Sequence, residues 1–181
     1  MKKVVIVYGS IAGLIVATLM TISMGIYHKT GNIENGMLVG YASMIIAFSL
    51  IFVGIKSYRD KHNAGAISFG KAFKVGLFIT LIASTFYVVA WLINYYCFMP
   101  DFMEKYSAAT INKLKSDGAS AEKIAGEIKE MAWFTENYKN PFFVALFTYV
   151  EILPVGLLVS LIAALVLKRR GKAAGMSTAR A

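Results

Sequence analysis

The last apolar run of the chain, from Phe142 to Leu167, decides the fold and reads FFVALFTYVEILPVGLLVSLIAALVL. Its length of about 26 residues gives roughly 39 Å of α-helix, enough to cross a hydrocarbon core of about 30 Å. Three bases follow it directly, namely Lys168, Arg169 and Arg170, and no lipid-buried helix continues through such a cluster. The run therefore predicts a membrane-spanning helix.

Two residues interrupt the apolar character of this run. Glu151 lies about 13 Å from its start, where an ionised carboxylate costs about 3 kcal/mol or more. Pro154 has no backbone N–H, so the Val150 carbonyl loses its usual donor. Glu151 is therefore either a proton or cation site, or a protonated carboxyl group hydrogen-bonded to a neighbouring helix. The candidate partners at comparable depths are Thr18, Ser43, Asn94 and Tyr87.

Small residues on the same helix lie on another face. At 100° per residue, Gly156, Ser160 and Ala164 point roughly opposite to Glu151. Because small residues let membrane helices approach closely, both faces are expected to be occupied. The helix then either sits centrally in a bundle, or Glu151 meets another copy of the protein.

The totals agree with a membrane protein. The 181-residue chain is 57% apolar and only 16% charged, and four long apolar runs fill most of it. We predict an all-α, four-transmembrane-helix bundle, with residues 1–170 as a single integral membrane domain. The predicted spans are residues 4–27, 37–55, 75–99 and 142–167. We expect 171–181 to be a disordered basic tail.

The remaining polar segment, residues 100–141, is predicted to be helical and to lie between the third and fourth spans. One amphipathic helix is expected near 102–115, and Asp117-Gly118 breaks it. Ser120 can cap a second helix that runs to about Met131. Such a pair either lies on the bilayer or caps the bundle.

The charges divide unequally between the two sides of the predicted bundle. The side with both termini carries about +11, and the other side carries about −1. The positive-inside rule places the basic side in the cytoplasm, so we expect a bacterial inner-membrane protein with both termini inside. This asymmetry accounts for the overall charge of +9 without a nucleic acid partner. The candidate anionic-lipid contacts are Lys56, Arg59, Lys71, Lys74, Lys168, Arg169 and Arg170.

Known catalytic and cofactor motifs are absent from the sequence. It contains no His-Glu-x-x-His, Walker A, Gly-x-Ser-x-Gly or Rossmann pattern. The two histidines are expected on opposite sides of the membrane, and a single cysteine excludes an internal disulfide and a multi-cysteine metal site. We therefore expect no catalytic residue, no metal and no cofactor, and do not expect an enzyme.

Three segments together resemble a known family. They are GIKSYRDK (54–61), ISFGKAFKVG (67–76) and EILPVG (151–156). The chain is similar over nearly its whole length to the DUF4199 family, bacterial four-span membrane proteins catalogued only as a domain of unknown function. The resemblance implies a four-span inner-membrane protein and assigns no activity.

The leading interpretation is a structural or interaction protein whose partners are membrane lipids and either a second copy of the chain or other membrane proteins. The alternative is a small transport or proton-linked component that uses Glu151.

Overall fold

A computed structural model describes residues 1–30 and 36–169 of the chain. The helices in these ranges are α1 (Lys2–Thr30), α2 (Gly36–Phe48), α3 (Leu50–His62), α4 (Phe69–Ile93), α5 (Phe102–Ser116), α6 (Ala121–Asn137) and α7 (Pro141–Leu167), and a short π-helix, η1 (Asn94–Phe98), continues α4. Four segments in these ranges are long and apolar enough to cross a membrane: Lys2–Tyr27, Leu38–His62, Phe69–Phe98 and Pro141–Leu167. The predicted all-α architecture with four such helices is confirmed. The tail predicted at 171–181 lies outside the described residues.

The second span differs from its prediction of 37–55. Helices α2 and α3 together form one candidate span that reaches His62, so the charged residues from Lys56 onward are helical rather than part of a loop. The sequence placed the end where hydropathy falls, whereas lysine and arginine are good helix formers and continue a helix into water. Only Ser49 separates α2 from α3, and its hydroxyl donates to the Ile46 carbonyl at 2.6 Å.

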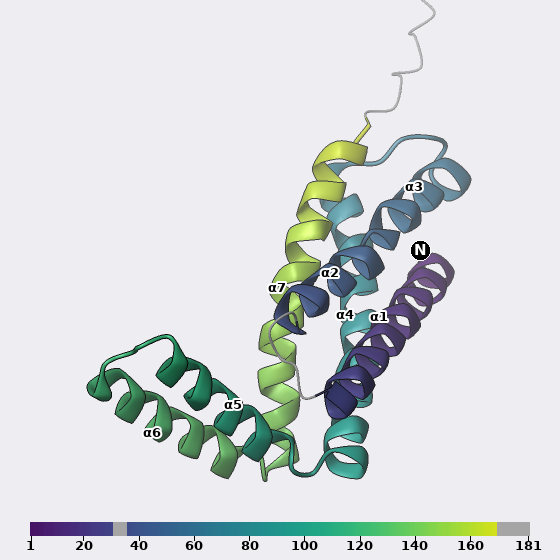
Figure 1. Cartoon of the computed structure of the whole chain (residues 1–181). Coiled ribbons are helices and arrows are strands. Elements are labelled where there is room, and N and C mark those ends of the chain that lie inside the picture. Colours follow the sequence, from purple (N-terminus) through teal and green to yellow (C-terminus); the bar gives the residue numbers. More distant parts are fainter. Residues whose placement is uncertain (31–35, 170–181) are drawn as a thin grey trace, which may run out of the picture.

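Helix α4 is the central element of the bundle. It packs most extensively against α1 on one side and α7 on the other, and α3 also packs against it (Figure 1). A Cβ atom built on Gly9 or Gly13 of α1 would lie 2.8 Å from Ile82 or Phe86 of α4. The small residues of α1 therefore allow a close approach of α1 and α4.

Small residues also form the contact between α4 and α7. A Cβ atom on Gly76 would lie 2.9 Å from the Ser160 side chain, and one on Gly156 would collide with Thr80 and with Phe48. In the same buried contact the Thr80 and Ser160 hydroxyl groups are 3.1 Å apart and hydrogen-bonded. The face of α7 that carries the small residues Gly156, Ser160 and Ala164 is thus the face that packs inside the molecule.

The segment between the third and fourth spans is a helical hairpin of α5 and α6. Gly118 turns the chain with a φ of 71°, and Ser120 caps α6 by accepting a hydrogen bond from the Lys123 N–H. Helix α6 runs to Asn137, beyond the predicted end near Met131. The hairpin projects sideways from the lower end of α7 (Figure 1) and does not cap the bundle.

The opposite end of the bundle is tied together by backbone hydrogen bonds. Ile67 and Arg169 exchange two antiparallel bonds of 2.9 Å, which join the loop before α4 to the chain after α7. Ser68 caps α4 by accepting a hydrogen bond from the Lys71 N–H. The turn before it contains Ala64 and Gly65 with φ of 50° and 74°.

The contact at Gly156 yields a stability prediction. The substitution Gly156→Ala should lower the free energy of unfolding by about 1–3 kcal/mol, because the added methyl group overlaps Thr80 and Phe48. Unfolding by SDS titration in mixed micelles, followed by circular dichroism, measures this change.

Gly40→Ala is the matched control, because Gly40 lies in α2 with no heavy atom within 4 Å of the added Cβ. It should be neutral or stabilising by up to about 1 kcal/mol, the helix preference of alanine over glycine. Equal stability of the two variants would contradict the proposed packing.

Candidate intramembrane polar site

Glu151 lies on the outer face of α7. Val150, which precedes it, and Pro154, one turn further on, are also exposed, whereas Thr148 and Ile152 are buried. Within the described part of the chain, the Glu151 carboxyl group makes no hydrogen bond and no ion pair. The carboxyl group therefore faces outward from the bundle, among apolar side chains. Helix α4, and not α7, is the central helix of the bundle, so the expectation that α7 sits centrally is wrong. Contact of Glu151 with another copy of the protein stays a prediction.

Pro154 lies one turn from Glu151, inside α7. It cannot donate a hydrogen bond to the Val150 carbonyl, because proline has no backbone N–H. Val150 and Glu151 are both exposed, so the residue whose carbonyl lacks this donor lies next to the acid on the outer side of the helix. The turn around Glu151 is thus the most polar part of an otherwise apolar face.

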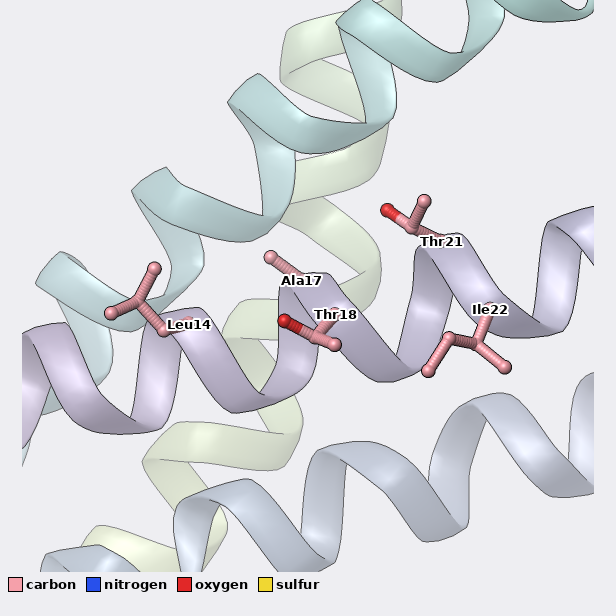
Figure 2. Close-up of a pocket in the computed structure, with 5 residues that line it drawn as sticks. All are labelled: Leu14, Ala17, Thr18, Thr21 and Ile22. Carbon is pink, nitrogen blue, oxygen red and sulfur yellow. The ribbon is translucent and has the colours of Figure 1, made fainter.

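Thr18, predicted as a partner at the same depth, is on the far side of the bundle. It is exposed on α1, and α4 lies between α1 and α7. Figure 2 shows Thr18 between Leu14 and Ile22, on the wall of a shallow hollow of about 270 Å³. The remaining lining residues are Ala17 and Thr21, so Glu151 takes no part in this hollow.

Asn94 is occupied by a different contact. Its side-chain amide donates to the Thr21 hydroxyl oxygen at 3.1 Å and to the Ala90 carbonyl at 2.8 Å. The first bond joins the end of α4 to α1, and the second stays within the helix. Asn94 thus stabilises the packing of these two helices and does not meet Glu151. Ser43 likewise bonds within its own helix, to the Val39 carbonyl at 2.7 Å.

Tyr87 is the one predicted partner within electrostatic reach of Glu151. Its ring is buried in α4 with 8% of its surface exposed, and it interacts electrostatically with the Glu151 carboxylate. Tyr138, which the sequence analysis did not select, interacts with Glu151 in the same way. Both phenols thus interact electrostatically with the carboxyl group, without a direct hydrogen bond to it in the described residues.

Tyr138 belongs to an aromatic cluster between the hairpin and the bundle. Its ring lies 5.4 Å from Tyr95, 6.0 Å from Phe143 and 6.2 Å from Phe147. Its backbone carbonyl accepts a hydrogen bond from the Tyr96 hydroxyl at 2.9 Å. Aromatic residues are common where membrane helices meet the water interface, but sequence spacing gave no sign that these rings pack on one another.

The basic residues predicted to contact anionic lipid lie at the other end of the bundle, and some already have partners. Arg59 pairs with Asp60 at 2.7 Å and donates to the Leu167 carbonyl at 3.4 Å, so it also stabilises the end of α7. Lys71 donates to the Asn63 side-chain oxygen at 2.9 Å. The residues Lys56, Lys74, Lys168 and Arg169 are exposed, and Arg170 lies outside the described residues.

Comparison with known proteins identifies the family of this chain. Residues 7–169 match the model of a family described as a protein of unknown function, DUF4199. The chain belongs to this family. Neither a curated protein nor a solved structure matches it. The DUF4199 match covers all four candidate spans almost completely and also includes Glu151 and the hairpin.

The position of Tyr138 predicts a pH dependence. Burial, and to a lesser degree the Glu151 carboxylate, raises the pKa of Tyr138 to about 12 from its ordinary value of 10.0, against a hydrogen bond with Trp91 that lowers it. A raised pKa means that the folded state favours the neutral phenol. The contribution of Tyr138 to stability is complete below pH 10 and is lost as the pH rises toward 12, by about 2–3 kcal/mol in all.

SDS-titration unfolding at a series of alkaline pH values measures this loss in wild-type protein and in Tyr138→Phe. The variant lacks the ionisable hydroxyl group, so its stability should fall less steeply over this range. Tyr106→Phe, in the more exposed α5, serves as the control. Parallel curves for all three proteins would show that Tyr138 titrates normally.

Proposed function

We propose that this DUF4199 protein is an integral protein of the bacterial inner membrane, with both termini in the cytoplasm, that serves as a structural or interaction module. The observation that carries the proposal is the exposed Glu151 carboxyl group on α7, which has no hydrogen-bond partner in the described residues. An ionisable side chain facing lipid is unfavourable unless something outside the bundle satisfies it. The molecule therefore has a face suited to contact another membrane protein.

Charge distribution supports the proposed orientation. Lys2 and Lys3 begin α1, and the basic residues of α3, of the start of α4 and of the chain after α7 belong to the same end of the bundle. Backbone hydrogen bonds between Ile67 and Arg169 hold two of these groups together. Anionic headgroups of the cytoplasmic leaflet attract such bases by about 1 kcal/mol each, so lipids are the expected partners of this end.

A small transport or proton-linked role is the second candidate, and the electrostatic interaction of Glu151 with two buried phenols, Tyr87 and Tyr138, favours it. A transport site would need a cavity that reaches Glu151, and two hollows of the structure can be compared with this requirement. One is the hollow on α1, and the other, of about 310 Å³, lies beside Tyr27 and Phe102 at the base of the hairpin. Neither includes Glu151, so neither supplies a path to the carboxyl group. We prefer the interaction module, because the Glu151 side chain faces outward from the bundle and lines neither of these hollows.

The proposed orientation predicts a labelling pattern. In a Cys97→Ser background, Lys115→Cys in the hairpin should react with a membrane-impermeant maleimide added to intact spheroplasts. Lys61→Cys, at the basic end, should react only after lysis. Both positions are exposed in the structure, so a difference in labelling reports their side of the membrane. The reverse labelling pattern would show that the protein has the opposite orientation in the membrane.

The two candidate functions predict different effects of Glu151→Gln. Purified protein in proteoliposomes with an internal pH-sensitive dye is given a pH step. If the protein is an interaction module, vesicles with wild type and vesicles with the variant should both leak protons only as fast as vesicles without protein. If wild type carries protons and Glu151→Gln abolishes this flux, while circular dichroism shows equal folding, the proton-linked function is correct and the preferred proposal is wrong.

A further inference from the structure

The outer face of α7 carries a regular row of exposed side chains. Glu151, Pro154, Leu158, Leu161 and Leu165 follow one another at alternating intervals of three and four residues, and we call this row the α7 seam. The exposed fractions of its three leucines are 58%, 41% and 49%. Spacing of this kind is that of the a and d positions through which two helices pack in a left-handed supercoil.

The bundle itself does not use this row. The buried face of α7, including Thr148, Ile152, Gly156 and Ser160, packs toward α4 and toward α2 and α3. Phe147, which would extend the α7 seam outward by one step, packs on Phe134 of α6 with ring centroids 5.2 Å apart. The seam therefore begins at Glu151, where the aromatic cluster ends, and continues to the basic end of the helix.

Glu151 restricts what can cover the seam. Acyl chains offer no hydrogen bond to a carboxyl group, and Glu151 is the only acidic or basic residue between Pro141 and Leu167. A second copy of this chain is inserted the same way round, so it brings its own Glu151 to the same depth. In a two-fold interface, equivalent residues near the axis meet one another.

Two carboxyl groups in contact can satisfy each other. When at least one is protonated, its O–H donates to the other carboxyl oxygen, and the Val150 carbonyl left free by Pro154 is a further acceptor one residue away. A single polar residue in an otherwise apolar seam also fixes the register of two helices, because any shift separates the polar groups. Glu151 thus provides both a hydrogen bond and a register.

We propose that two copies of this protein pair through their α7 seams, parallel and two-fold symmetric, with the two Glu151 carboxyl groups hydrogen-bonded at the outer end of the contact. The inference rests on the proposed interaction function and names its partner as a second copy. Close packing continues through Leu158, Leu161 and Leu165 toward the basic end of α7.

Disulfide cross-linking in native membranes tests the pairing. In a Cys97→Ser background, Leu158→Cys places one thiol on the seam, and Leu14→Cys on α1 is a matched control with a closely similar exposed fraction, 56%. Mild oxidation at low expression should give a covalent dimer for Leu158→Cys at least about tenfold faster than for Leu14→Cys. Equal rates, or a Leu158→Cys product with another protein in place of the dimer, would overturn the proposal.

Second substitutions test the role of the carboxyl group. Glu151→Gln should leave cross-linking through Cys at position 158 within about twofold, because an amide pair can replace a carboxyl pair. Glu151→Ala removes the hydrogen bond and should reduce cross-linking about threefold to tenfold, the effect of one interhelical hydrogen bond in a membrane. Equal cross-linking in the Gln and Ala variants would overturn the central role of Glu151.

The two proposals fail in different ways. Loss of seam cross-linking, with no proton flux in proteoliposomes, rejects the homodimer and leaves an interaction module with a different partner. A proton flux that depends on Glu151 rejects the interaction module itself, whatever the cross-linking shows. SDS-titration unfolding of Glu151→Ala serves as the folding control, and its midpoint should match that of wild type because the side chain faces outward.

Discussion

The structure depends on the close approach of α4 to its two neighbours, α1 and α7. Lipid tails are as apolar as the side chains that they replace, so burial alone does not drive helices together in a membrane. Glycines remove the side-chain volume between these helices, and the buried Thr80–Ser160 hydrogen bond adds a directed contact. The rest of the bundle is arranged around this pair of contacts. They also fix which face of α7 is left outside, and hence the direction in which Glu151 points.

Local features of the fold could be predicted from the sequence because their causes are local. The spans follow from long apolar runs, the hairpin turn from Asp117-Gly118, and the start of α4 from Ser68. The end of α3 was predicted wrongly because hydropathy indicates where a helix leaves the hydrocarbon core of the membrane, and not where the helix ends. Charged residues carried this helix on to His62.

The candidate site was less predictable, because it depends on which helices are neighbours. A helical wheel showed that Glu151 and Gly156 lie on different faces of α7, but it could not show which face is buried. That required the central position of α4. Depth alone also made Thr18 and Asn94 appear to be partners of Glu151, whereas α4 separates Thr18 from α7 and Asn94 bonds to Thr21. Tyr138 was missed because it lies in the polar segment and approaches Glu151 only through the fold.

The antiparallel pairing of Ile67 with Arg169 has a mechanical consequence. Arg169, just after α7, lies beside the loop that leads into α4, and two backbone hydrogen bonds connect it to Ile67. A force applied at Arg169 is therefore transmitted both to α7 and, through Ile67, to the start of α4. A partner that binds at Arg169 would therefore act on the central helix α4 as well as on α7.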